Sequence, residues 1–249
     1  MAIDDAWRQI ENVRVVGDGV HIHLRCPLAF VSLLRVTLSG WYIESAALGA
    51  APQTLVREID GTFEIDSLTL EKSNKSHDIT DALNFLILCI AYLYKAGSER
   101  GALLHGAAFR EGGKDVVVFG RKGAGKSSLA FSQAVAGSRV YADDLIYWDM
   151  QKNEFVALGL PLRMRRPIPE AFRPYVDSKQ FVVGERIVYS RDGVFDVAEV
   201  GCRFFPDVIK EFDEHRELRP IPLFKVLDRI RRYSIDARFT EVRNKRLDQ

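Results

Sequence analysis

Cysteine is scarce in this sequence, and the cysteines that are present form no pairing pattern. Cys26, Cys89 and Cys202 are odd in number, lie far apart and make no C-x-x-C motif in a chain of 249 residues. Disulfide frameworks and cysteine-based zinc sites both need grouped cysteines, so the sequence predicts neither. The first ten residues also lack the apolar core of a secretory signal peptide. We therefore expect a reduced, cytoplasmic protein.

A surplus of one charge and a long hydrophobic run are missing as well. Lys and Arg number 35 against 34 Asp and Glu, and the formal net charge is +1. Such a balance gives no overall attraction to nucleic acid or to an anionic membrane, so neither is an expected partner. The most apolar stretch, residues 82–94, is shorter than the roughly 20 residues that span a bilayer. It predicts a buried helix that begins after Asp78.

The chain does have ample material for a core, since hydrophobic residues make up 47% of it. Its first part carries short β-branched and aromatic runs broken by glycines, among them residues 33–38, which predict strands. Strands and helices alternate afterwards, with helices expected at residues 206–216 and 222–232. We expect an α/β protein of the α+β type with a β-rich N-terminal domain, 1–78, and a second domain, 79–249.

The most informative motif lies in the second domain. Residues 120–127 read Gly-Arg-Lys-Gly-Ala-Gly-Lys-Ser, which fits G-x-x-x-x-G-K-[ST], between an apolar run at 116–119 and a helical pattern at 128–136. A strand, a glycine-rich turn and a helix start form an anion trap, in which Lys126 reaches phosphates and Ser127 holds Mg²⁺. A chance glycine-rich turn would leave this lysine and serine unexplained. The residues expected to bind the nucleotide are Gly120, Arg121, Lys122, Gly123, Ala124, Gly125, Lys126, Ser127 and Ser128.

Two further features carry chemistry that would suit this loop. Asp143 and Asp144 follow an expected strand, where one carboxylate can meet Mg²⁺ and the other can accept a proton from an acceptor hydroxyl. A solvated Asp-Asp turn is the alternative interpretation. His105 lies in an expected strand, residues 103–109, and is followed by glycine. On its own it would be a core or turn histidine.

Together these segments resemble the HPr kinase/phosphorylase family, part of the P-loop class that also contains phosphoenolpyruvate carboxykinase. The matching pieces are His105 with its glycine, residues 120–127, and the Ala-Asp-Asp of residues 142–144. The spacings match too, with 21 residues from the histidine to the P-loop lysine and 18 from that lysine to the second aspartate. The resemblance covers residues 83–150 well and the rest loosely.

The resemblance implies a P-loop kinase core of the HPr kinase/phosphoenolpyruvate carboxykinase type. It also implies ATP-dependent transfer of phosphate, with Mg²⁺, to a serine hydroxyl of a peptide or protein. By this analogy Asp144 is the general base, Lys126 holds the phosphates, and Ser127 binds the metal. His105 lies in the active site, and Asp143 supports the metal or its water shell. Relatives often form ring-shaped oligomers, so a homo-oligomer is one expectation.

The chain departs from the family in one motif. The family's Glu-Ile-Arg-Gly-Leu-Gly segment contributes a glutamate to the metal site, whereas residues 156–163 here read Val-Ala-Leu-Gly-Leu-Pro-Leu-Arg. This argues against the reverse phosphorylase reaction and against HPr as the partner, and the family's C-terminal arginine has no clear counterpart. The runs Leu-Leu-His-Gly-Ala-Ala at 103–108 and Gly-Ala-Gly-Lys-Ser-Ser at 123–128 resemble shorter HPr kinase-related proteins. Some of these phosphorylate a serine of a lasso precursor peptide.

Arg163 and Arg165 are candidate substrate contacts. They alternate around Met164, so a strand would place both on one face, where they could clamp a γ-phosphate or a peptide carboxylate. A solvated basic strand edge is the alternative. Two other functions stay open, a kinase for a small hydroxylated metabolite and a nucleotide-binding module without transfer activity. ATP is favoured over GTP only by the resemblance. The Asn/Thr-Lys-x-Asp signature of guanine-specific proteins is not present.

Overall fold

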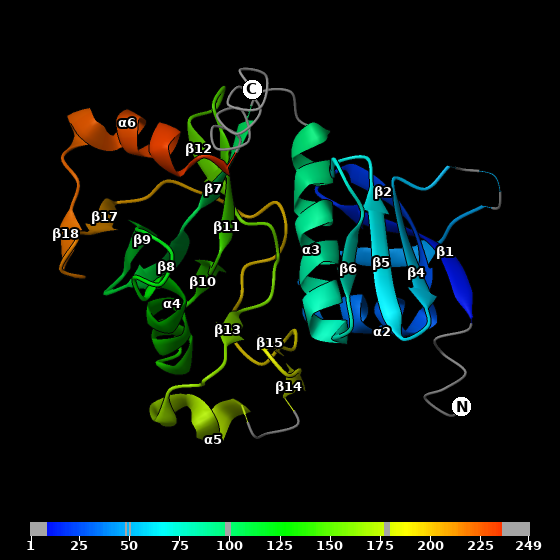
Figure 1. Ribbon diagram of the computed structural model, residues 1–249. Helices are drawn as coiled ribbons and strands as arrows, with labels where there is room; N and C mark the ends of the chain where they lie inside the picture. Colours follow the sequence, from blue (N-terminus) through cyan, green and yellow to red (C-terminus); the bar gives the residue numbers. More distant parts are fainter. Residues whose placement is uncertain (1–8, 48, 50, 98–100, 177–179, 236–249) are drawn as a thin grey trace, which may run out of the picture. The chain divides into compact units, whose positions relative to one another are not determined.

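The computed structural model describes residues 9–47, 49, 51–97, 101–176 and 180–235. Within these ranges lie five α-helices, a short 3-10 helix and four β-sheets (Figure 1). Two of the sheets are mixed and two are antiparallel. This confirms the expected mixed α/β class.

The described residues form two compact units. The first unit comprises the described residues up to Gly97 together with Arg163–Val194. The second unit comprises the described residues between Gly97 and Arg163 together with those from Phe195 onwards. The expected domains, 1–78 and 79–249, stay a prediction; the units differ from them because the helix after Asp78 and the segment 163–194 both group with the N-terminal sheet. Each unit is described by itself.

The first unit is built on a six-stranded sheet. Its strands, in spatial order, are β3 (Tyr42–Ser45), β1 (Ile10–Gly17), β2 (Val20–Pro27), β4 (Thr54–Ile59), β5 (Thr62–Ser67) and β6 (Asn74–Ser76). β2 and β4 run parallel, and the other neighbours run antiparallel. Side chains alternate along the strands, so one face is buried, as Val13, Val15 and Ile65 show.

Helix α2 (Leu28–Thr37) packs on β1 and β2 of this sheet. The expectation of a strand at residues 33–38 was wrong, because most of these residues belong to this helix. Phe30, Leu34 and Thr37 are buried at helical spacing. Phe30 meets Phe63 of β5 edge to face at 5.3 Å, which ties the helix to the sheet.

Helix α3 (Ile79–Ala96) runs alongside β5 and β6 (Figure 1). The Asp78 side chain accepts hydrogen bonds from the backbone N–H groups of Thr80 at 2.8 Å and Asp81 at 2.9 Å, as the sequence predicted. By length and composition alone α3 could cross a membrane, and 56% of it is buried inside the structure. That burial agrees with the expected core helix.

A three-stranded antiparallel sheet completes the first unit. Its order is β13 (Arg163–Arg165), β15 (Ile187–Ser190) and β14 (Phe181–Val183). Between β13 and β14 lie the 3-10 helix η1 (Glu170–Phe172) and the short helix α5 (Arg173–Val176). The Arg163 guanidinium and the Tyr189 hydroxyl both donate hydrogen bonds to the Asn84 side chain of α3. These bonds join the three-stranded sheet to α3.

The second unit contains two sheets. The five-stranded sheet has the order β10 (Val140–Ala142), β8 (Ala107–Glu111), β9 (Lys114–Phe119), β17 (Val208–Phe212) and β18 (Leu218–Pro220). The four-stranded sheet has the order β16 (Arg203–Phe204), β12 (Glu154–Val156), β11 (Leu145–Asp149) and β7 (Gly101–His105). Helices α4 (Lys126–Val135) and α6 (Leu223–Tyr233) complete the unit. Their shared core includes Leu104, Phe119, Ile146 and Tyr233.

Two expectations for this unit need correction. Residues 206–216 were expected as a helix, but they contain strand β17, which pairs in parallel with β9. Residues 103–109 were expected as one strand, but the chain changes sheets at Gly106. A Cβ at Gly106 would lie 3.1 Å from the Val118 carbonyl oxygen, so glycine allows this close crossing. The helix expected at 222–232 is present as α6.

Candidate active site

The glycine-rich loop joins β9 to α4, the order that the sequence predicted. Gly123 and Gly125 have φ angles of 80° and 110°, which L-residues rarely adopt. A Cβ at Gly120 would lie 3.0 Å from the Cβ of Phe212 in β17. The backbone φ angle therefore favours glycine at positions 123 and 125, and the close packing against Phe212 favours it at position 120.

The start of α4 is suited to an anion. Gly125 is the N-cap, no side chain caps the helix there, and its first turn holds no acidic residue. The first backbone N–H groups of a helix have no partner within the helix and carry a partial positive charge. Ser127 and Ser128 are half-buried in this first turn. The loop and the helix start therefore offer donors to an anion.

Lys126 lies over this loop with only 4% of its surface exposed. Its Nζ donates to the carbonyl oxygens of Gly120 at 2.8 Å and Arg121 at 3.1 Å. A buried ammonium needs such partners, because removal from water disfavours its charge. The Lys126 side chain therefore lies against the glycine-rich loop, where the motif predicts that it binds phosphates.

The geometry of the five-stranded sheet brings the expected site segments to one edge. β8 pairs antiparallel with both β9 and β10, so β9 and β10 run in the same direction. The loop follows the end of β9, and Asp143 and Asp144 follow the end of β10. His105 and Gly106 come just before the start of β8. All three segments consequently lie at the same edge of this sheet.

His105 and Asp144 are in direct contact. The Nδ1 atom of His105 lies 3.1 Å from Oδ1 of Asp144, and the two side chains are 24% and 25% exposed. The backbone N–H of Gly106 donates to the Asp144 carbonyl oxygen at 3.2 Å. The pairing of His105 with Leu145 between β7 and β11 sets this register. Asp143, in contrast, is 5% exposed.

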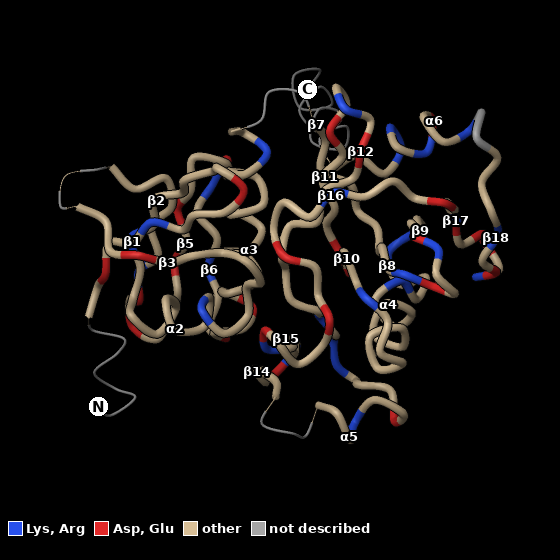
Figure 2. Tube along the Cα trace, turned by 180° about the vertical axis from the view of Figure 1, so that it is seen from behind, with Lys and Arg blue, Asp and Glu red and all other residues tan. Residues whose placement is uncertain are grey.

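A pocket of about 510 Å³ lies beside the loop and was not predicted. Its lining residues are Arg121 and Lys122 of the loop and Arg232 and Tyr233 of α6. Basic residues recur along α6 (Figure 2). The sequence could have indicated a basic helix, but nothing in its spacing connects residue 232 with residue 121.

Glu211 of β17 holds α6 in place. It accepts hydrogen bonds from the Tyr233 hydroxyl and from Nε of Arg229, each at 2.7 Å. The Tyr233 ring stacks on Phe119, the last residue of β9, with ring centres 5.1 Å apart. Burial first, and then the bond to Glu211, raise the pKa of Tyr233 to about 12. These contacts keep Arg232 on the pocket side of the loop.

The expected substrate residues belong to the first unit. Arg163 lies in β13, an edge strand of its sheet, and hydrogen-bonds Asn84. Arg165 is exposed on the same strand. Their role as a substrate clamp stays a prediction, and Arg163 already has a structural contact.

The candidate metal ligands at the sheet edge suit Mg²⁺ better than a metal ion whose ligands all come from protein side chains. Ser127 and Asp143 supply a hydroxyl and a carboxylate, the oxygen ligands that Mg²⁺ prefers. Within the described ranges, no group of three or more His, Cys, Asp or Glu side chains could hold a metal ion. Mg²⁺ commonly takes one or two carboxylates and completes its shell with phosphate oxygens and water.

No protein-family model matches this chain. No curated protein matches it either. A functional proposal therefore depends on the residues and their arrangement.

Proposed function

We propose that this chain is an ATP-dependent serine kinase of the cytoplasm, with a P-loop core of the HPr kinase/phosphoenolpyruvate carboxykinase type. Its acceptor would be a serine hydroxyl of a peptide or protein, and we propose a ribosomally made precursor peptide of the lasso type. The observation that supports this most is that loop 120–127, the Asp143-Asp144 pair and His105 lie at the same edge of one sheet, with His105 in contact with Asp144. Phosphoryl transfer needs a phosphate cradle, a metal and a group that positions or deprotonates the acceptor. These segments supply candidates for each.

The loop would hold the phosphates of ATP. Backbone N–H groups at the start of α4 face an anion favourably, and Lys126 would exchange its bonds to the Gly120 and Arg121 carbonyls for phosphate oxygens. Ser127 and Asp143 would hold Mg²⁺, which neutralises charge on the phosphate oxygens when bound. The chain would thus place the γ-phosphorus at the same edge as the acid pair.

Asp144 would serve as the general base. The acceptor Oγ attacks the γ-phosphorus, its proton passes to the Asp144 carboxylate, and the bond from the γ-phosphorus to ADP breaks. His105 would act as a positioning residue, because its Nδ1 contact at 3.1 Å holds the carboxylate in one orientation. The product is a phosphoserine, and the proton leaves Asp144 to solvent.

A kinase for a small hydroxylated metabolite is a second candidate. The pocket beside the loop favours it, because its basic side chains Arg121, Lys122 and Arg232 could hold an anionic metabolite. A peptide acceptor would need to reach the Asp144 carboxylate through an open approach. Asp144 is 25% exposed, which permits such an approach.

An intact-mass assay separates these functions. The purified chain is incubated with ATP and Mg²⁺ and with each small peptide encoded beside its gene. We expect one peptide to gain a single phosphate on serine, and we expect Asp144→Asn to abolish that gain while ATP still binds. ATP binding with no phosphate gained by any of these peptides would contradict the peptide kinase and favour the metabolite kinase or a nucleotide-binding module.

A further inference from the structure

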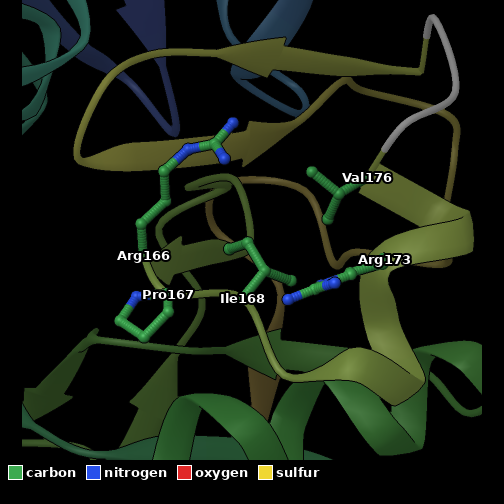
Figure 3. Close-up of a pocket in the computed structure, with 5 residues that line it drawn as sticks. All are labelled: Arg166, Pro167, Ile168, Arg173 and Val176. Atoms are coloured by element: carbon green, nitrogen blue, oxygen red, sulfur yellow. The ribbon is translucent and has the colours of Figure 1, made fainter.

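A second pocket lies in the first unit, in the segment between β13 and β14. It has a volume of about 500 Å³ and is lined by Arg166, Pro167, Ile168, Arg173 and Val176. Figure 3 shows Arg173 reaching from α5 towards Ile168, with Arg166 on the other side of Ile168. No expected site residue lies in this pocket.

The pocket combines two positive charges with an apolar floor. Ile168 is 8% exposed and Val176 is 3% exposed, so both are anchored in the unit, whereas the two arginines are exposed. Among the described residues that line it, none is acidic.

Neither guanidinium is neutralised by another described residue. Nε of Arg166 donates to the carbonyl oxygen of Gly184 at 3.1 Å, which orients the side chain without cancelling its charge. The Arg173 side chain makes no hydrogen bond or ion pair within the described ranges. Two like charges that share a pocket favour an anion, and guanidinium groups bind carboxylates in a two-pronged geometry.

We propose that this pocket binds the C-terminal end of a peptide, with the two arginines on the terminal carboxylate and the apolar floor under the last side chain. The apolar floor decides against a bare phosphate, which would gain nothing from Ile168 and Val176. A small carboxylic acid with an apolar group shares the same chemistry, and the test separates the two sources. The site is independent of phosphoryl transfer, so it can be tested without ATP.

The test uses the full-length chain with ¹⁵N-labelled arginine. The Nε–H signals of Arg166 and Arg173 are followed by NMR during titration with N-acetylated tripeptides Gly-Gly-X, where X is Leu, Val, Phe or Asp. Each peptide is used as the free acid and as the C-terminal amide, and N-acetyl-leucine and inorganic phosphate are titrated separately. We expect both signals to shift with the apolar free acids and amidation to weaken binding at least tenfold.

Variants test which residues are responsible. Arg173→Ala should weaken binding of the Leu free acid at least tenfold, and Arg166→Lys should weaken it as well, because lysine keeps the charge but loses the planar fork. Arg191→Ala is the matched control, since Arg191 is exposed in the same unit and does not line the pocket. It should leave binding unchanged. Circular dichroism checks that each variant is folded.

Several results would overturn the proposal. One is the absence of any signal shift with the free acids at about 10 mM, a concentration at which a millimolar complex would be seen. The others are equal binding of the free acids and their amides, and binding of phosphate as tight as that of the Leu free acid. An equal loss in Arg191→Ala would show attraction by general charge alone. Binding of N-acetyl-leucine as tight as that of the tripeptide would replace the peptide by a small carboxylic acid as the ligand.

Discussion

The backbone of the glycine-rich loop allows a prediction with a control inside the same chain. Gly123 lies in the loop before α4, and Gly137 lies just after that helix. Both have a φ angle of 80°, and a Cβ at either position would meet no atom within 4 Å. Alanine at either position is therefore strained by its backbone angle alone, at about 1–2 kcal/mol. The two substitutions should cost the same stability.

Their effects on nucleotide binding should differ. The strained alanine of Gly123→Ala should distort the loop, so that its N–H groups would no longer converge on the phosphates. We expect ATP affinity to fall at least tenfold, about 1.4 kcal/mol. Gly137→Ala changes only the end of α4 away from the loop, so its ATP affinity should equal that of the unmodified protein. Thermal unfolding gives the stabilities, and isothermal calorimetry with ATP and Mg²⁺ gives the affinities.

Either of two outcomes would refute this reasoning. If both variants lose similar stability and both bind ATP normally, loop 120–127 is not the phosphate cradle. If Gly123→Ala loses several kcal/mol more than Gly137→Ala, the space around its Cβ is not open as described. A loss of affinity in both variants would point to general damage to α4 instead.

Four further substitutions test the rest of the site. Asp144→Asn should reduce phosphate transfer by at least a hundredfold with little change in ATP affinity, as expected for loss of a general base. His105→Gln should lower turnover less than Asp144→Asn does. Equal losses in the two variants would contradict a positioning role for His105. Lys126→Ala should weaken ATP binding in calorimetry, and an unchanged affinity would exclude the phosphate contact. The pKa of Tyr233, about 12 in the folded chain, should fall in Glu211→Gln, because the carboxylate that accepts the hydrogen bond from its hydroxyl is removed. Since this pKa is raised above the usual value near 10, the stability it contributes is present below pH 10 and is lost as pH rises towards 12. Alkaline unfolding followed at several pH values should therefore show a shallower loss in Glu211→Gln.

Local features of the sequence predicted the loop and its flanking elements well. An apolar run, three glycines and a helical pattern follow one another within about twenty residues, and the structure has β9, the loop and α4 in that order. The cap at Asp78 and the buried helix α3 were predicted for the same reason. Turn glycines, caps and amphipathic periods act between near neighbours, so they can be recognised without knowledge of the fold.

Strand and helix assignments failed where packing overrides local preference. Residues 33–38 are rich in leucine and valine, and their preference is ambiguous until helix α2 buries Leu34 and Thr37 on a sheet. Residues 206–216 carry many charged side chains and looked helical. Their strand β17 exists because it pairs in parallel with β9, more than eighty residues earlier in the chain.

The sequence alone therefore determined which residues are the candidates for the proposed chemistry: the loop lysine and serine, the aspartate pair, and the histidine before a glycine. Only the tertiary structure decided how they meet. The contact between His105 and Asp144 depends on the antiparallel pairing of β7 with β11. The position of Arg232 beside the loop depends on Glu211 and on the stacking of Tyr233 on Phe119. Such contacts join residues far apart in the chain, and no local preference encodes which strand becomes the neighbour of another.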